Sequence, residues 1–160
     1  MRLLPTLALF LTLATAPAQA EDWERYVNGD LGFSISVPMD SFAVTAESSG
    51  RVSMKEIGGT AQLDIFGVRN PQALSRREFE RMMETADPNR RITYRAAGRS
   101  WFVLSGYLEN EAEPTIFYAK FMLNRSGTSL SAFEISYPRA EKAAYDAIVE
   151  GLEGSLTAPD

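Results

Sequence analysis

The sequence of 160 residues contains no histidine and no cysteine. Histidine is the side chain that most often acts as a general base near neutral pH, and it is also the commonest metal ligand. Cysteine would supply a thiolate nucleophile or a disulfide. Their absence excludes thiol chemistry and serine hydrolases of the Ser-His-Asp type, and the fold must be stabilised by a packed core without disulfides.

Sequence motifs of other enzyme classes are missing as well. There is no Gly-x-Ser-x-Gly elbow, no serine three residues before Lys55, Lys120 or Lys142, and no glycine-rich phosphate loop. Carboxylates without histidine or cysteine seldom build a zinc site. We therefore expect no cofactor, no metal site and no catalytic residue that a motif identifies.

Carboxylate chemistry is the enzyme class that stays open. A glycosidase needs two carboxyl groups about 5 to 9.5 Å apart across a cleft. Asp64 and Glu134, or the group Glu109, Glu111 and Glu113, have suitable side chains, but nothing in the sequence pairs them. The competing interpretation places Asp64 and Glu134 on solvent-facing sides of strands and the three glutamates in a solvated loop without a calcium-binding pattern.

The first twenty residues have the pattern of a cleavable secretory signal. Arg2 precedes an apolar run from Leu3 to Leu13, and Ala18-Gln19-Ala20 suits signal peptidase. The run is shorter than the roughly 20 residues that span a bilayer, so we expect no stable membrane insertion. We expect cleavage after Ala20 and a periplasmic or secreted protein, with residues 21–160 as a single domain.

The charge balance is acidic, with 16 basic and 21 acidic residues. Removal of Arg2 with the signal would leave 15 basic residues against the same 21 acidic ones, a net charge of about −6. This balance disfavours nonspecific binding to nucleic acid or to anionic lipid. One segment, residues 69–99, is locally positive because it contains eight arginines.

Apolar periodicity predicts strands on both sides of one helix. Turn glycines between successive strands indicate antiparallel hairpins, and Ser75 with Glu78 forms a capping box that opens the first helix. The predicted strands are 23–27, 33–37, 52–57, 60–68, 91–97, 100–108, 115–123 and 130–137, and the predicted helices are 75–86 and a closing one around 144–152. We predict an α+β sandwich: a mostly antiparallel sheet of about six to eight strands with two main helices.

Five blocks of the sequence resemble the PsbP and DcrB superfamily, whose antiparallel sandwich is shared by the Ran-binding Mog-type proteins. The blocks contain turn glycines and core aromatics: Trp23 to Pro38 with Leu31-Gly32-Phe33, Gly58 to Ala61, Ile92-Thr93-Tyr94, Phe102 to Tyr107, and Ile135 to Pro138 followed by a helix. Together they resemble exported proteobacterial members.

The resemblance implies a fold and a mode of action. It implies the PsbP-like α+β sandwich, and because members in photosynthetic assemblies bind protein partners, it favours a binding or assembly role. Histidines implicated in metal binding there have no counterpart in this sequence. The resemblance therefore implies no metal site here.

Arginines of the 91–97 segment are the best candidates for a binding site. Strict alternation places Ile92, Tyr94 and Ala96 on one side and Arg91, Thr93 and Arg95 on the other. Arg91 and Arg95 are four residues apart on that face, about 13 Å between their Cα atoms, and two long arginine side chains that lean together suit one carboxylate or phosphate. The candidate residues are Arg91, Arg95, Arg90, Arg99 and Tyr94. The alternative is that these arginines pair with the protein's own acidic residues or are solvated.

Five aromatic residues suit a ligand cleft or, equally, the core and its rim: Tyr94, Trp101, Tyr107, Tyr118 and Tyr137. Three functional hypotheses follow. The first is a noncatalytic exported module that docks a partner protein of the cell envelope. The second is a carrier of a small anionic or amphiphilic ligand, which requires an enclosed apolar pocket with an arginine at its mouth. The third is a carboxylate-based hydrolase.

The signal has a direct test. When the whole gene is expressed in a Gram-negative host, we expect the protein recovered from the periplasm or medium to begin at Glu21, because peptidase cuts after Ala20. Intact-mass spectrometry measures this. A full-length protein in the cytoplasmic fraction would contradict the prediction of export.

Overall fold

The computed structural model describes residues 22–109 and 111–160, so the signal predicted for residues 1–20 lies outside the described residues. The described residues form nine strands and two α-helices: β1 (Trp23–Asn28), β2 (Phe33–Pro38), β3 (Phe42–Ser48), β4 (Arg51–Glu56), β5 (Gln62–Arg69), α1 (Arg76–Thr85), β6 (Arg90–Ala97), β7 (Trp101–Leu108), β8 (Thr115–Leu123), β9 (Ser129–Pro138) and α2 (Lys142–Ser155). A 3-10 helix, Arg139–Glu141, joins β9 to α2. Within this part of the chain, the helices are too short or too polar to cross a membrane.

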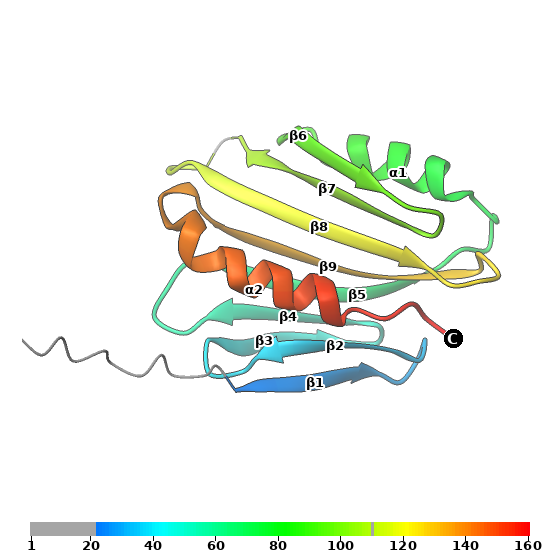
Figure 1. Ribbon diagram of the computed structural model, residues 1–160, viewed down its shortest axis with the longest axis horizontal. Helices are drawn as coiled ribbons and strands as arrows, with labels where there is room; N and C mark the ends of the chain where they lie inside the picture. Colours follow the sequence, from blue (N-terminus) through cyan, green and yellow to red (C-terminus); the bar gives the residue numbers. More distant parts are fainter. Residues whose placement is uncertain (1–21, 110) are drawn as a thin grey trace, which may run out of the picture.

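Seven strands form one antiparallel sheet in the order β3-β4-β5-β9-β8-β7-β6, and β1 and β2 form a separate hairpin (Figure 1). Each pair of neighbours in the sheet is antiparallel. The predicted α+β sandwich with a mostly antiparallel sheet is therefore confirmed. The strands carry apolar side chains on both faces of the large sheet, so other elements must cover each face.

One face of the sheet packs against α2 and the β1–β2 hairpin, and we call it the α2 face. In Figure 1, α2 crosses this face in front of the middle strands, and the hairpin lies at the β3 and β4 end. Its core is apolar and fully packed, with side chains from β2, the sheet and α2: Phe33, Ile35, Val37, Phe42, Leu63, Ile65, Phe133, Ile135, Tyr145, Ile148 and Leu152. The ring of Tyr145 stacks on Tyr137 with 4.6 Å between ring centroids.

The opposite face carries α1, and we call it the α1 face. Ser75 caps this helix through the predicted capping box: its side chain accepts the Glu78 N–H, and the Glu78 carboxylate accepts the Ser75 N–H at 2.7 Å. Phe79 of α1 is buried in a cluster with Phe102, Leu104, Phe117, Phe121, Leu123, Leu130 and Ala132. Met83 packs against the same cluster, whereas Met82 is 41% exposed.

Strand β3 is the element that the sequence did not predict. Only Phe42 of its seven residues is buried, because β3 is an edge strand of the sheet and its other side chains face solvent. Alternation of apolar and polar residues signals a strand only when one face is buried. Between the predicted strands 33–37 and 52–57 the chain thus forms a further strand, followed by a tight turn at Ser49 and Gly50, where Gly50 has φ +79°.

A β-bulge in β6 changes which residues share a face. Ile92 pairs with Gly106 and Tyr94 pairs with Ser105, so Thr93 is an extra residue without a partner. An inserted residue reverses the alternation beyond it. Arg91 and Tyr94 therefore lie on the α2 face, and Arg95 lies on the α1 face. The prediction that Arg91 and Arg95 share a face is wrong, because strict alternation ends at Thr93.

Gly106 makes room for this bulge. A Cβ atom at Gly106 would lie 2.0 Å from the carbonyl oxygen of Arg91 and 2.9 Å from the Cα of Ile92. Both are backbone atoms, which cannot rotate away as a side chain does. The close approach of the bulged backbone to β7 thus requires glycine at this position.

Replacement of Gly106 by alanine has a clear expected effect. We expect G106A to lower the free energy of unfolding by about 1–3 kcal/mol, as overpacking does when backbone must shift. Urea unfolding followed by circular dichroism measures this change. The matched control is G154A in α2, where a Cβ meets nothing within 4 Å. There alanine should be neutral or stabilise by up to about 1 kcal/mol, because alanine favours helix over glycine. Equal effects of both substitutions would contradict the packing argument.

Candidate functional site

Helix α2 leaves part of its face of the sheet open, and a groove runs there between α2 and strands β6, β7 and β8. We call it the tyrosine groove. Its volume is about 470 Å³ and it is open to solvent. Residues of the sheet and of the 3-10 helix and α2 line it: Thr93, Tyr94, Ser105, Gly106, Tyr107, Ile116, Tyr118, Tyr137, Arg139, Lys142, Asp146 and Val149.

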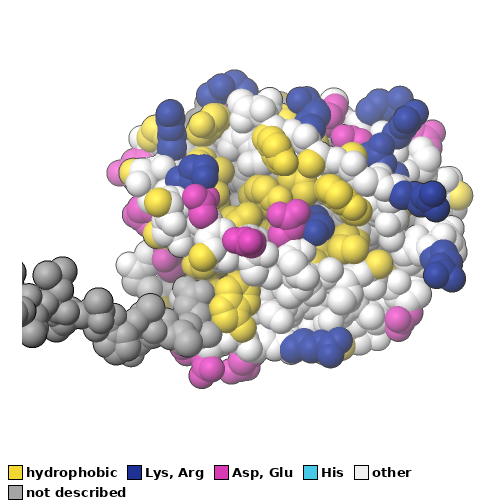
Figure 2. Space-filling model, viewed as in Figure 1, with side chains coloured by type: hydrophobic (Ala, Val, Ile, Leu, Met, Phe, Trp, Pro, Cys, Tyr) yellow, Lys and Arg dark blue, Asp and Glu magenta, His cyan; other side chains and the backbone are white. Residues whose placement is uncertain are grey.

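Four of the five aromatic residues that the sequence offered for a ligand cleft line the groove. Tyr94 is 54% exposed, Tyr107 and Tyr118 are half-buried, and Tyr137 is buried in the groove floor. Figure 2 shows hydrophobic side chains gathered on this face of the molecule, over β7 and β8 and beside α2. Trp101 is not among the lining residues. The Lys120 ammonium lies 5.6 Å from its ring centroid.

Two arginines flank Tyr107 at one end of the tyrosine groove. The guanidinium carbon of Arg91 lies 4.8 Å from the ring centroid of Tyr107, and that of Arg139 lies 5.4 Å from it. Arg91 also donates from Nε to Glu109 Oε1 at 3.1 Å. Arg139 has no ion pair within the described residues.

Helix α2 is held to β8 beside the groove by a polar contact at Glu153. The Tyr118 hydroxyl donates to Glu153 Oε2 at 2.8 Å, and Lys120 Nζ donates to the Glu153 carbonyl oxygen at 2.9 Å. Burial raises the pKa of Tyr118, and the hydrogen bond to Glu153 raises it further. Burial also raises the pKa of Tyr137. Both phenols are therefore neutral at physiological pH, and the Tyr118 hydroxyl acts as a hydrogen-bond donor and not as a base.

The four candidate arginines do not form one patch. Arg91 lies beside Tyr107 on the α2 face, whereas Arg95 lies on the α1 face and its Nε donates to Glu84 of α1 at 2.6 Å. Arg99 is exposed in the turn between β6 and β7. Arg90 points across the α1 face, away from the groove. The structure thus separates the residues that sequence spacing had grouped, and only Arg91 and Tyr94 remain together.

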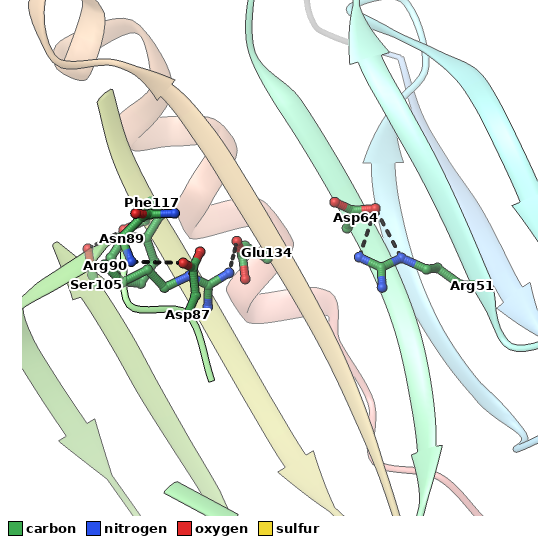
Figure 3. Close-up of polar contacts among 8 residues, drawn as sticks. All are labelled: Arg51, Asp64, Asp87, Asn89, Arg90, Ser105, Phe117 and Glu134. Carbon is green, nitrogen blue, oxygen red and sulfur yellow. Dashed lines mark hydrogen bonds and ion pairs between the residues drawn. The ribbon is translucent and has the colours of Figure 1, made fainter. Parts of the chain in front are cut away.

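The α1 face has a hollow of its own, of about 450 Å³, at the end of the sheet that α1 does not cover. Two ion-paired groups lie in and beside it, and we call them together the ionic cluster: Arg51 with Asp64, and Arg90 with Asp87 and Glu134. Figure 3 shows both groups. Arg90 Nη2 donates to Glu134 Oε1 at 2.6 Å, and its Nε lies 3.4 Å from Asp87 Oδ2. The Arg90 guanidinium carbon lies 5.0 Å from the centroid of the buried Phe117 ring.

The ionic cluster brings together the carboxylates that the hydrolase hypothesis requires. Asp64 of β5 and Glu134 of β9 are directly paired in register. Burial raises the pKa of Glu134, and Arg90 opposes that rise. However, Arg90 binds Glu134, and Arg51 Nη2 lies 3.2 Å from Asp64 Oδ1. Both carboxylates thus have cationic partners, an arrangement typical of an ion-pair network that connects the strands and the loop before β6.

The three glutamates of the acidic loop after β7 have different surroundings. Glu109 pairs with Arg91, and Glu111 and Glu113 are exposed at the rim of the α1-face hollow. Across residues 22–109 and 111–160, no three acidic side chains are grouped as a metal ion requires.

Sequence reasoning missed Arg139, Lys142 and Asp146 as groove residues. They lie at the start of the closing helix, where the apolar stripe was the only signal. Pro138 ends β9 and sends the chain into the 3-10 helix, which turns Arg139 toward Tyr107 of a different strand. No spacing in the sequence connects positions 107 and 139, so only the fold reveals their proximity.

Comparison with known proteins identifies the fold. No protein-family model and no curated protein matches this sequence. The solution structure of cyanobacterial PsbP (CyanoP) from Synechocystis sp. PCC 6803 is similar, with a TM-score of 0.65, 12% identity, and coverage of 91% of this chain and 97% of that one. The 1.9 Å crystal structure of the Saccharomyces cerevisiae Ran-binding protein Mog1p has a TM-score of 0.61 and 7% identity over 86% and 96% of the two chains. The protein therefore has the PsbP and Mog1 type of fold, as its sequence blocks predicted; identities this low establish the fold alone.

The ionic cluster generates a prediction about stability and pH. We expect R90M to lower the free energy of unfolding by about 1–3 kcal/mol at about pH 8. This loss is smaller than that for a fully buried ion pair, because the side chains of Arg90 and Glu134 are 16% and 20% exposed. A folded-state pKa raised above its usual value gives stability that is lost as pH rises. Loss of Arg90 raises the pKa of Glu134 further, so the destabilisation should be smaller at about pH 4.

Urea unfolding of wild type and R90M at both pH values measures this difference. The control is R125M, because Arg125 is exposed in the turn after β8 and has no ion pair in the described part of the chain. It should leave the free energy of unfolding unchanged at either pH. A loss in R90M that is the same at both pH values would refute the electrostatic role of Arg90.

Proposed function

We propose that this protein is a noncatalytic binding protein of the bacterial cell envelope, which docks a partner protein through the tyrosine groove. The observation that carries the proposal is the open groove itself: a face of half-exposed tyrosines next to Arg139, a cation without an ion pair in the described residues. Tyrosine and arginine are, with tryptophan, the residue types enriched at the energetic centres of protein interfaces. The export signal predicted for residues 1–20 supports the envelope as the place of action.

A protein segment fits this groove better than an enclosed small ligand does. The carrier hypothesis requires a cavity closed on most sides, because ligand sites typically bury 70–90% of a small molecule. The tyrosine groove is open to solvent, and the core beneath it is packed, with Phe133 and Ile135 fully buried. Arg139 does stand at its mouth, as the carrier hypothesis requires. The open shape nevertheless favours the docking of a protein surface.

The partner is expected to lie on the groove and not to extend the sheet. Strand β6 is an edge strand, and edges can pair with a strand of another protein. The bulge at Thr93 and the charged Arg91 and Arg95 are features with which proteins block such pairing. Docking by side chains on the α2 face therefore suits this edge.

The fold supports a binding role in general. Mog1p is by name a Ran-binding protein, and its fold is the one found here at a TM-score of 0.61. Fold alone does not determine a partner. The tyrosine groove supplies the site on which this proposal depends.

Site-specific photocrosslinking in the native host tests the proposal. A photoreactive phenylalanine analogue at position 94 should form an adduct with one envelope protein, which mass spectrometry then identifies. The purified partner should bind the wild-type protein in solution, and Y94A should weaken its Kd by about tenfold or more, as expected when a central aromatic contact is lost.

Ile57 provides the matched control. It is a large apolar side chain, 61% exposed, and lies outside the residues that line the groove. The analogue at position 57 should give no adduct with the same protein, and I57A should leave the Kd unchanged. An adduct obtained equally from both positions, or a Kd that Y94A does not alter, would exclude the groove as the docking surface.

A further inference from the structure

Building on the proposed function, we infer that the tyrosine groove recognises an acidic segment of its partner, in which a carboxylate binds Arg139 while a neighbouring apolar side chain packs on Tyr94 and Tyr107. The class of partner is thus a protein that presents Asp or Glu beside an aromatic or aliphatic residue. Three features of the groove support this inference.

The first feature is the placement of Arg139 against a ring. Its guanidinium carbon lies 5.4 Å from the centroid of Tyr107. An arginine packed against an aromatic ring keeps the N–H groups at its edge available, and these match a carboxylate with two parallel hydrogen bonds. The ring contact also restricts the side chain before binding, which reduces the entropy lost when a partner binds.

The second feature is the charge balance at this end of the groove. Three cations lie there, and two have carboxylate partners: Arg91 Nε lies 3.1 Å from Glu109 Oε1, and Lys142 Nζ lies 2.7 Å from Asp146 Oδ1. Arg139 lacks a carboxylate partner in the described part of the chain. It shares the Tyr107 ring with Arg91, so a second anion would relieve the repulsion between two cations. An acidic group on the partner supplies that anion.

The third feature is the apolar surface that continues on both sides of Arg139. Tyr94, Tyr107 and Ile116 lie on the groove side. On the other side, Arg139 borders a shallow hollow lined by the apolar Pro114, Pro138 and Ala140 together with Glu113. A carboxylate bound by Arg139 therefore has apolar protein surface next to it in both directions. A segment that carried only acidic residues would leave this surface uncovered.

A peptide selection tests the recognition chemistry directly. Random peptides of about twelve residues displayed on phage are selected against the purified exported protein, and binders are retained only if Y94A fails to bind them. We expect the retained peptides to be enriched in Asp or Glu next to an aromatic or aliphatic residue. R139E should weaken their Kd by about tenfold or more, the effect of losing a hydrogen bond to a charged group.

Matched variants separate charge from fold. R139K keeps the charge but lacks the planar pair of donors, so it should give a smaller loss than R139E. R125E makes the same charge reversal in an exposed turn before β9, whereas Arg139 follows β9, and it should leave the Kd unchanged. Added salt should weaken binding to wild type more than to R139E.

The outcomes distinguish this inference from the proposed function. Retained peptides without acidic enrichment, or with an affinity that R139E leaves intact, would overturn the acidic segment while the groove remained the docking surface. Failure to retain any Tyr94-dependent peptide would overturn the inference. If the photocrosslinks from position 94 also failed, the proposed function would fall with it.

Discussion

A sheet too wide for the elements that cover it is the constraint on which the rest of this structure depends. Seven strands, at about 4.8 Å between neighbours, make a sheet about 29 Å across. On the α2 face, one helix about 10 Å in diameter and a two-stranded hairpin of similar width cover roughly two thirds of that distance. The hairpin and α2 cover the core side chains of β4, β5 and β9 and part of β8 on this face. The remaining strands, β6 and β7, have exposed side chains on this face, and the tyrosine groove forms there.

The two uncovered regions are stabilised in different ways. On the α2 face the open region carries tyrosines, whose rings pack on apolar neighbours while their hydroxyl groups contact water or polar partners. On the α1 face the open region carries the ionic cluster, in which Arg90 connects the loop before β6 to the central strand β9. The Arg90 guanidinium covers the Phe117 ring, which is otherwise at the margin of the region that α1 protects. On each face, side chains with both apolar and polar parts thus lie between the packed core and the solvent.

The bulge in β6 connects the fold to the groove. It depends on the absence of a side chain at Gly106, and it transfers Tyr94 to the α2 face beside Arg91. Without it, Tyr94 would lie on the same side as Ile92, facing α1. The same bulge disfavours pairing of the β6 edge with another strand. One extra residue therefore positions an exposed ring over the groove and also protects the edge of the sheet.

Local patterns in the sequence are sufficient to predict the fold class and most of its elements. Repeated apolar patterns and turn glycines predict eight of the nine strands and both helices, because their signal is local and each core residue follows the period of its element. Edge strand β3 was not predicted, because Phe42 is its only buried residue. The candidate site, in contrast, depends on contacts between distant segments of the chain. Arg91 and Arg95 lie on opposite faces because the bulge at Thr93 reverses the alternation, and that bulge arises from the pairing of β6 with β7. Arg139 contacts Tyr107 because the chain reverses direction after Pro138. Such contacts join residues distant in sequence, and no local pattern encodes them.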